Sequence, residues 1–302
     1  MVAALKLALT GATGFVGAHV LDLALGQGHA VRALTRRQQP PRDRVTWVEG
    51  ALDDPAELAA LVEGADAVIH VAGVINADAS GFEAGNVAGT AAMLAVAERA
   101  GVGRFVHVSS LAAREPGLSL YGASKARSEA LVSASPLSSA IVRPPAVYGP
   151  GDRETLELFK MAKRGWVMLP PPGRLSLIHV DDLARLMLAL AASDRSLLVE
   201  PDDGRPRGWT HEQFGHALGQ AVGRKVHTLS APSALLRLAA RVDTLVRGRK
   251  AKLTPDRAAY FCHPDWTISP ANAAPADLWQ PQVLTEQGLA ATAAWYREQR
   301  WL

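Results

Sequence analysis

The sequence predicts an α/β fold: a doubly wound parallel sheet followed by a smaller C-terminal α+β lobe. Three observations support this prediction. Short apolar runs alternate with helical patterns six times before residue 145, and a glycine-rich turn joins the first run to the first helical pattern. The alternation weakens from about residue 200, where prolines and tryptophans become more frequent. The chain has 302 residues, of which 48% are hydrophobic, so it can bury the core of a large domain and of a smaller lobe.

The first strand is expected over residues 5–9, and it runs into the turn Gly11-Ala-Thr-Gly-Phe-Val-Gly17. Gly11 allows a sharp turn, Gly14 allows backbone to approach a phosphate, and Gly17 allows the next helix to pack closely on the sheet. The free N–H groups at the start of that helix would then face a pyrophosphate. The pattern predicts a Rossmann-type dinucleotide site, the alternative being a glycine-rich turn without a ligand. The turn residues expected to contact the dinucleotide are Gly11, Thr13, Gly14, Phe15, Val16 and Gly17.

The second strand, residues 29–35, ends in Thr35-Arg36-Arg37 without a carboxylate. An acidic residue here would accept hydrogen bonds from the adenine ribose hydroxyls, and it would repel a 2′-phosphate. Arginine instead pairs with a phosphate in bidentate fashion. We therefore predict that Arg36 and Arg37 select NADP(H), with NAD(H) as the possible alternative. Ordinary surface arginines are the other interpretation.

The following segments continue the sheet. The expected elements are a strand over 45–50, a helix from Asp54-Pro55, a strand over 65–73, a helix over 82–100, a strand over 104–110, a helix over 120–132 and a strand over 138–143. Aspartate caps a helix and proline fits its first turn, which explains the start at Asp54. The small residues Ala72 and Gly73 leave room for a cofactor at their strand end. In parallel sheets, ligands bind beyond the carboxyl ends of the strands.

The helix after the fifth strand begins with Tyr121-Gly-Ala-Ser-Lys125, which places Tyr121 and Lys125 on one helical face. Free tyrosine has a pKa of about 10. We expect the Lys125 ammonium and an oxidised nicotinamide to lower it. Tyr121 could then exchange the proton of an alcohol–ketone pair while hydride moves at carbon. Ser110, at the neighbouring strand tip, is expected to polarise the same oxygen, with Ser109 as the alternative.

The second half of the chain is less regular. It contains a proline-rich loop over 144–151, a helix over 154–165, a loop over 165–173, a strand over 175–179 and a helix over 181–190. We expect residues 1–150 to form the dinucleotide-binding domain, with parts of 175–200 returning to it. Residues 151–302 would be mainly a substrate-binding lobe.

An apolar, basic helix is expected over residues 233–247. It could face a membrane or a hydrophobic substrate, but packing in the core is the favoured interpretation. A basic cluster of Arg247, Arg249, Lys250 and Lys252 follows. We interpret it as a solvated helix end in preference to a contact with nucleic acid or anionic lipid.

Several motifs in order resemble those of one enzyme superfamily. They are Thr10-Gly-Ala-Thr-Gly-Phe-Val-Gly17, Val71-Ala-Gly73, Asn86-Val-Ala-Gly-Thr90, Val108-Ser-Ser110, Tyr121-Gly-Ala-Ser-Lys125, Arg143-Pro-Pro145, Tyr148-Gly-Pro150 and His179-Val-Asp-Asp182. Over residues 5–190 the chain is similar to the extended short-chain dehydrogenase/reductase superfamily. More narrowly, it resembles the NAD-dependent epimerase/dehydratase family, near its 3β-hydroxysteroid-dehydrogenase-like branch.

The resemblance implies a catalytic triad carried by Ser110, Tyr121 and Lys125, with Lys125 also holding the nicotinamide ribose. It implies that Asn86 is structural or supports a proton relay. It further implies that the segment Arg143-Pro-Pro145 and the residue Val147 line the part of the site that holds the nicotinamide and the substrate. Besides the glycine turn and the two arginines, we expect eleven further positions to contact the cofactor: Leu52, Asp53, Val71, Ala72, Gly73, Asn86, Val108, Tyr121, Lys125, Pro144 and Val147.

Two departures from the family pattern narrow this expectation. Gly50 is followed by Ala51, where many members carry an aspartate that meets the adenine amino group. That contact must come from Asp53, from backbone or from nowhere. Leu111-Ala112 stands where dehydratases carry an acidic pair, which disfavours sugar-nucleotide dehydration.

The sequence therefore predicts an NADP(H)-dependent oxidoreductase that interconverts a secondary alcohol and a ketone. The alternatives are a nucleotide-sugar epimerase with tightly bound NAD(P) and a non-catalytic NADP(H)-binding scaffold or sensor. We expect a small-molecule substrate, no metal, no nucleic acid and no membrane span, and a monomer or homodimer. Binding to nucleic acid is disfavoured because the net charge is only +3, the basic residues are scattered along the chain, and no aromatic residues alternate with them. A single cysteine, the start of the first strand near residue 5 and the lack of a signal-peptide pattern favour a cytoplasmic location.

Overall fold

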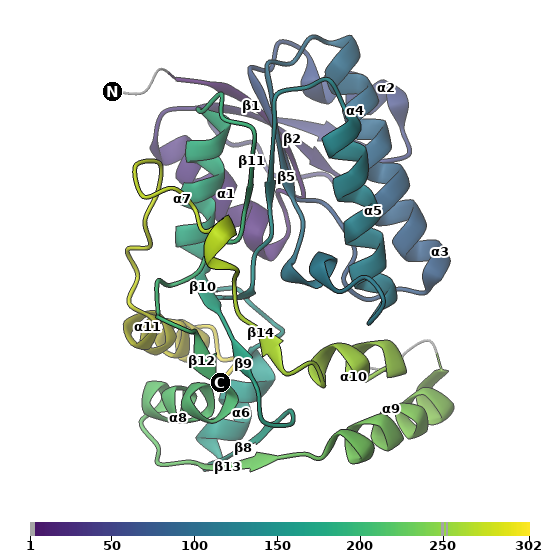
Figure 1. The fold of residues 1–302 in the computed structure, drawn as a ribbon. Helices are drawn as coiled ribbons and strands as arrows, with labels where there is room; N and C mark the ends of the chain where they lie inside the picture. Colours follow the sequence, from purple (N-terminus) through teal and green to yellow (C-terminus); the bar gives the residue numbers. More distant parts are fainter. Residues whose placement is uncertain (1–3, 249–250, 252) are drawn as a thin grey trace.

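The computed structural model describes residues 4–248, 251 and 253–302 (Figure 1). Of the basic cluster expected after the helix of residues 233–247, Arg249, Lys250 and Lys252 lie outside the described residues. In the part of the chain that is described, no helix combines the length and the apolar character needed to cross a bilayer.

A seven-stranded parallel sheet forms the upper part of the molecule in Figure 1, which confirms the predicted fold class. The strand order is β11-β6-β5-β4-β1-β2-β3, so the order reverses beside β1. In such sheets this reversal opens a crevice at the carboxyl ends of the strands. The strands are β1 (Lys6–Thr10), β2 (Ala30–Thr35), β3 (Val45–Glu49), β4 (Ala67–His70), β5 (Arg104–Val108), β6 (Ser139–Val142) and β11 (Leu197–Val199).

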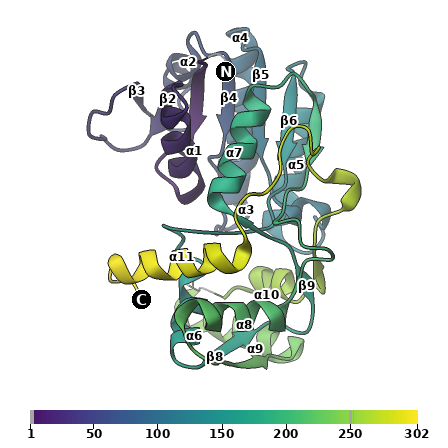
Figure 2. The ribbon, with the colours of Figure 1, turned by 90° about the vertical axis from the view of Figure 1, so that its left-hand side faces the viewer.

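Helices cover both faces of this sheet (Figures 1 and 2). Helices α1 (Phe15–Gly26) and α7 (Val180–Ala191) lie on one face, and α2 (Pro55–Val62), α4 (Gly89–Arg99) and α5 (Leu120–Ala134) lie on the other. Successive side chains of a strand point to opposite faces. Leu7 and Leu9 of β1 therefore join the apolar cluster of α1 and α7, whereas Ala8 joins that of α2 and α4. This two-sided burial explains why the strands are continuous apolar runs.

The long helix expected over residues 82–100 is interrupted. It consists of α3 (Ala79–Phe82), a π-helical segment η1 (Glu83–Ala88) and α4. At Gly89 the helix passes close to Leu52, since a Cβ at that position would lie 2.6 Å from Cδ1 of Leu52. The π-helical segment carries Asn86, and such segments are frequent at functional sites.

The smaller lobe lies below the sheet in Figure 1. Its helices are α6 (Leu156–Lys163), α8 (His211–Val222), α9 (Ser233–Arg247), α10 (Pro255–Phe261) and α11 (Thr285–Glu298). Its strands are β7 (Ala146–Tyr148), β8 (Trp166–Leu169), β9 (Arg174–Leu175), β10 (Leu177–His179), β12 (Trp209–Thr210), β13 (His227–Ser230) and β14 (Asp265–Trp266). The strand expected over 175–179 is thus two short strands. Tyr148, Phe159, Leu289 and Tyr296 form the centre of the lobe's own core.

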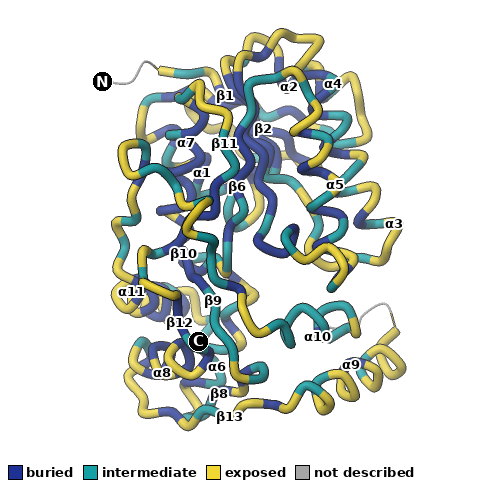
Figure 3. Tube along the Cα trace, in the orientation of Figure 1, coloured by how far each residue is buried: buried dark blue, intermediate teal, exposed yellow. Residues whose placement is uncertain are grey.

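Helix α9 forms where it was predicted, but its expected packing in the core is wrong. Ala240 is the one buried residue of α9, and five large apolar side chains of the helix are exposed. Periodicity reports that a helix has an apolar face without reporting what covers that face. In the described structure α9 contacts α10 and runs along the outer edge of the lobe, where its trace is mostly exposed (Figures 1 and 3).

Candidate active site

A cavity of about 1220 Å³ lies between the carboxyl ends of the sheet strands and the lobe. Pockets for single small ligands usually measure about 300–1,000 Å³, so this cavity has room for a dinucleotide and a second molecule. The predicted residues that line it are Gly11, Thr13, Gly14, Phe15, Val16, Gly17, Arg36, Leu52, Asp53, Val71, Ala72, Gly73, Val108, Ser110, Tyr121, Lys125, Pro144 and Val147. Arg37 and Asn86 are the two predicted residues that do not line it.

The glycine turn has the geometry of a phosphate-binding turn. Gly11 has a φ of 76°, a left-handed conformation that glycine adopts without strain. A Cβ on Gly17 would lie 2.0 Å from the carbonyl oxygen of Gly11, so the helix reaches the turn only because that side chain is absent. Gly14 is the N-cap of α1 and offers no side chain to its first N–H groups. These donors therefore face the cavity and can receive an anion.

The two arginines at the end of β2 differ. Both side chains are exposed, but Arg36 alone lines the cavity. The backbone N–H of Arg37 donates to the Thr35 hydroxyl, which in turn donates to the Arg37 carbonyl. The turn thus directs Arg36 to the cavity, whereas Arg37 contributes backbone to the turn.

Tyr121 and Lys125 lie on the first turns of α5, which Ser119 caps by accepting from the N–H of Gly122 at 2.9 Å. Gly122 brings α5 close to the 3₁₀ turn η2 (Leu111–Arg114), because a Cβ there would lie 2.6 Å from the carbonyl oxygen of Ala112. The buried Lys125 ammonium donates to the Val108 carbonyl at 2.8 Å. Strand β5 and helix α5 therefore hold the three predicted catalytic residues at one end of the cavity.

The pKa of Tyr121 differs from the expectation. Burial raises it above its ordinary value, and hydrogen bonding with Ser110 opposes this only in part. The expected lowering of the Tyr121 pKa by Lys125 is therefore wrong. Lys125 is itself buried, and burial lowers its pKa to about 8, with the nearby Glu129 acting in the opposite direction. The Tyr121 hydroxyl thus keeps its proton at neutral pH, which is the state that a proton donor requires.

The two serines at the end of β5 have different partners. The buried Ser109 hydroxyl donates to Oε1 of Glu129 at 2.5 Å. The Ser110 hydroxyl accepts from the N–H of Ala112 at 3.2 Å and hydrogen-bonds with Tyr121. Ser110 is therefore the serine that the geometry leaves available to a substrate oxygen.

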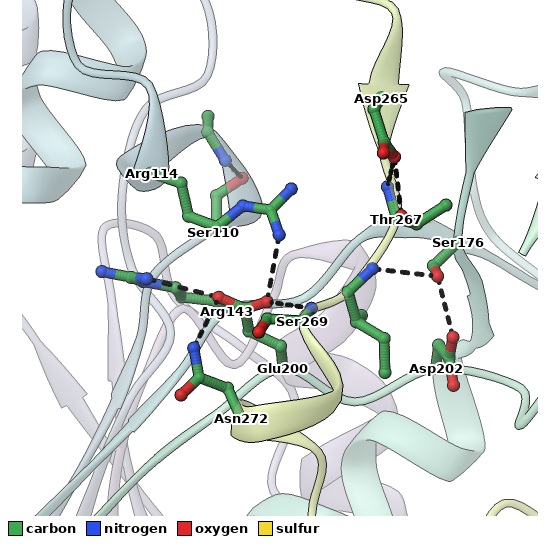
Figure 4. A network of polar contacts seen from close by, with 12 residues as sticks. Ser110, Arg114, Arg143, Ser176, Glu200, Asp202, Asp265, Thr267, Ser269 and Asn272 are labelled. Carbon is green, nitrogen blue, oxygen red and sulfur yellow. Dashed lines mark hydrogen bonds and ion pairs between the residues drawn. The ribbon is translucent and has the colours of Figure 1, made fainter. Parts of the chain in front are cut away.

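An ionic cluster with two buried carboxylates, Glu129 and Glu200, supports this end of the cavity, and sequence reasoning missed both of them. Figure 4 shows the part of the cluster around Glu200. Arg143 binds both oxygens of Glu129, at 2.8 and 2.6 Å, and also Glu200 at 3.3 Å. Arg114 binds the other oxygen of Glu200 at 3.2 Å. Glu129 lies one turn after Lys125 on α5, a spacing that could have drawn attention to it; no local signal points to Glu200.

The carboxylate of Glu200 also contacts the C-terminal part of the chain. Glu200 is fully buried and accepts from the N–H of Ser269 at 2.7 Å and from the side chain of Asn272 at 3.2 Å (Figure 4). The cluster thus joins the end of β5, where Ser109 and Ser110 lie, to residues 269–272.

Asn86 holds the loop after β4 in place. Its Oδ1 accepts from the N–H of Val74 at 2.8 Å, and its Nδ2 donates to the Val74 carbonyl and to the Ser124 hydroxyl. Of the two roles expected for Asn86, structural or supporting a proton relay, these hydrogen bonds fit the structural one. It also explains why Gly73 is needed, since a Cβ there would lie 2.9 Å from Oδ1 of Asn86.

The lobe side of the cavity is mostly apolar. Its lining side chains include Leu158, Met161, Leu175, Phe214, Leu236 and Phe261. Tyr260 stacks on Trp266, with ring centroids 4.5 Å apart, beside Tyr121. Arg257, a cation in this wall, is bound to Glu154 at 2.7 Å. The wall therefore offers an apolar surface next to the predicted catalytic residues.

Comparisons with known proteins agree with this arrangement. A model of the NAD dependent epimerase/dehydratase family matches residues 7–199. The chain is 38% identical over 305 residues to the ceramide reductase of Caulobacter vibrioides, covering 98% of this chain and 95% of that protein. It is 26% identical over 324 residues to the 2-alkyl-3-oxoalkanoate reductase of Stenotrophomonas maltophilia, covering 94% and 97%.

Solved structures share the fold at low identity. MoeE5 in complex with UDP-glucose and NAD has a TM-score of 0.76 at 21% identity, covering 98% of this chain and 100% of that one. The UDP-N-acetylglucosamine 4-epimerase from Bacillus cereus has a TM-score of 0.73 at 17% identity, covering 97% of each chain. At these identities the likeness concerns the fold alone.

Proposed function

Because the chain belongs to the NAD dependent epimerase/dehydratase family and is an enzyme of the extended short-chain dehydrogenase/reductase type, we propose that it uses NADPH to reduce a ketone on a long-chain lipid to a secondary alcohol. The observation that carries this proposal is the position of a half-buried, protonated Tyr121. It stands beside Ser110 where the dinucleotide side of the cavity meets the apolar lobe wall.

The cavity fits a dinucleotide on its sheet side. The uncapped start of α1 would bind the pyrophosphate. Gly17 and Gly73 allow the close contacts with Gly11 and Asn86 that shape the glycine turn and the loop after β4. Arg36 would pair with the 2′-phosphate of NADPH, and β2 ends without a carboxylate that would repel it. NADH is the alternative cofactor, since MoeE5, which shares the fold, binds NAD.

The bound nicotinamide supplies the hydride. Ser110 would hydrogen-bond the ketone oxygen and orient it, and Tyr121 would give its proton to that oxygen as charge develops there. The raised pKa of Tyr121 supports this direction of proton transfer, because a tyrosine that holds its proton is ready to donate it. Lys125 would hold the nicotinamide ribose, and its bond to the Val108 carbonyl fixes its position.

The substrate class follows from the lobe wall. An apolar surface suits acyl chains, whereas the diphosphate of a nucleotide sugar would need cations. The wall's Arg257 is already paired with Glu154. The name of the Caulobacter relative, ceramide reductase, agrees with a lipid substrate. We therefore favour an N-acylated sphingoid base that carries a ketone.

The test measures NADPH consumption by the purified protein with such a ketone in detergent micelles, and identifies the alcohol by mass spectrometry. We expect turnover in the wild type and a loss of about 100-fold or more in Tyr121→Phe, with NADPH binding retained. Matched incubations use UDP-glucose and UDP-N-acetylglucosamine. Epimerisation of either sugar without lipid reduction would overturn the proposal in favour of an epimerase. NADPH binding without any turnover would favour a scaffold.

A further inference from the structure

Among the residues that the structure describes, none covers the apolar stripe of helix α9, which consists of Leu235, Leu238, Val242, Leu245 and Val246. These side chains are 56%, 58%, 52%, 87% and 75% exposed. Their spacing of three and four residues places them on one face of the helix. The opposite side carries the buried Ala240 and packs toward α10. In Figure 3 the exposed trace of α9 forms the outer edge of the lobe.

The charges beside the stripe are mainly positive. Arg241 is exposed at the edge of the stripe, and Arg237, one turn earlier, is exposed on the same side of the helix but farther from the stripe. Arg247 is exposed at the end of the helix. The one acidic residue of α9 is Asp243, which pairs with Arg247 at 3.2 Å. An exposed apolar face flanked by arginines is typical of helices that lie in the headgroup region of anionic bilayers.

We propose that α9 docks the protein on the surface of an anionic lipid bilayer, with the apolar stripe facing the acyl chains and Arg237 and Arg241 at the lipid phosphates. A second copy of the chain fits the stripe less well. Two paired stripes would bring like-charged arginines together. Helix α9 has 15 residues and is about 22 Å long, so two paired stripes would bury no more than roughly the lower limit of the 1,200–2,000 Å² of a stable interface.

The docked helix also borders the cavity. Leu236, on the inner side of α9, lines the cavity together with Leu253 and with Arg257 and Phe261 of α10. A lipid that leaves the bilayer beside α9 would therefore reach the lobe wall without crossing bulk water. This link between docking and substrate entry rests on the proposed function, whereas docking itself does not.

The test is co-flotation of the full chain with vesicles, measured without cofactor or substrate so that the result does not depend on catalysis. One set of vesicles is phosphatidylcholine, and the other has equal parts of phosphatidylcholine and phosphatidylglycerol. We expect binding to the anionic vesicles, weakened by high salt, and little binding to the neutral ones.

Two paired variants and one control locate the contact. Leu245→Ser with Val246→Ser should weaken vesicle binding at least about tenfold. Arg237→Gln with Arg241→Gln should weaken it about tenfold and reduce its salt dependence. Leu284→Ser removes an apolar side chain that is 64% exposed and lies outside α9, and it should bind vesicles like the wild type. All variants should keep the wild-type melting temperature and the wild-type turnover of a short water-soluble ketone.

Three outcomes would overturn the proposal. The wild type could fail to bind anionic vesicles, or it could bind neutral vesicles equally well. The serine pair could also bind as tightly as the wild type. A dimer seen by sedimentation that the serine pair dissociates, without vesicle binding, would instead identify the stripe as a contact between copies.

Discussion

The sheet wall of the cavity consists mainly of backbone and short side chains from a few continuous segments, to which Arg36, Tyr121 and Lys125 add longer side chains. The lobe wall consists mainly of apolar side chains from segments far apart in the chain. Residues 11–17 alone provide most of the expected pyrophosphate contacts. The lobe wall, in contrast, is lined by Leu158, Leu175, Phe214 and Phe261, which belong to four different elements: α6, β9, α8 and α10. The difference teaches that the cofactor side depends on precise backbone geometry, while the substrate side depends on the summed area of many replaceable side chains.

The largest expected effect is therefore that of one methyl group in the sheet wall. Gly17→Ala places a Cβ 2.0 Å from the Gly11 carbonyl oxygen, so the turn must shift. We expect NADPH affinity, measured by fluorescence titration, to fall at least about 100-fold. Gly26→Ala in the same helix is the matched control, because nothing lies within 4 Å of its Cβ. Equal NADPH affinity in the two variants would contradict the role of the turn.

The two serines at the end of β5 sharpen the comparison among the residues predicted to be catalytic. Ser110→Ala should lower kcat about 100-fold, because the substrate oxygen loses one hydrogen-bond donor. Ser109→Ala removes a donor from Glu129 and should change kcat only a few-fold while lowering the melting temperature. Steady-state kinetics and thermal unfolding of both variants measure this. A reversed order of the kcat effects would make Ser109 the catalytic serine.

The arginines at the end of β2 differ in the same way. Arg36→Ala should weaken NADPH binding about tenfold or more and leave NADH binding unchanged, because only NADPH carries the 2′-phosphate. Arg37→Ala should have a smaller effect, since its side chain does not line the cavity. Calorimetric titration with both cofactors tests this prediction. Equal losses for NADPH and NADH in Arg36→Ala would argue against the assignment.

A single truncation in the lobe wall should have a graded effect. Phe261→Ala removes one apolar side chain of several, so we expect KM for a long-chain ketone to rise about tenfold. The KM for NADPH and the turnover of a short ketone should stay unchanged. An equal rise of both KM values would show that the two walls are not independent.

The smallest expected effect is that of pH on kcat/KM for NADPH, through the protonation of Lys125 in the sheet wall. The pKa of Lys125 is lowered to about 8, so its ammonium is present below that pH and is lost above it. We expect kcat/KM for NADPH to fall severalfold as pH rises through about 8. The pH profile of Lys125→Arg, if that variant is active, should lack this limb, because arginine stays charged. A wild-type profile that stays flat to about pH 10 would contradict the assignment.

The sheet wall could be predicted from the sequence because its determinants are local. The glycine turn, the strand ends and the pair Tyr121 and Lys125 each depend on residues within a few positions of one another. The predicted fold class is confirmed for the same reason, since every strand of the sheet except the last was visible as an apolar run.

The features that sequence reasoning missed depend on distant residues. The pKa of Tyr121 depends on burial, to which the tertiary fold contributes, and the sequence-based expectation had the wrong direction. The bond between Arg143 and Glu200 spans 57 positions. For α9 the apolar periodicity predicted the helix correctly but not its packing, because only the tertiary structure decides whether another element covers an apolar face.

The ionic cluster around Glu200 has a consequence for protein engineering. A chimaera that kept the sheet domain and exchanged everything after residue 199 would leave the partly buried Arg114 and Arg143 without their shared carboxylate, a costly arrangement. A junction placed after Glu200 would still separate that carboxylate from Ser269 and Asn272. New substrate specificities are therefore better introduced by replacing single side chains of the lobe wall than by grafting a foreign lobe.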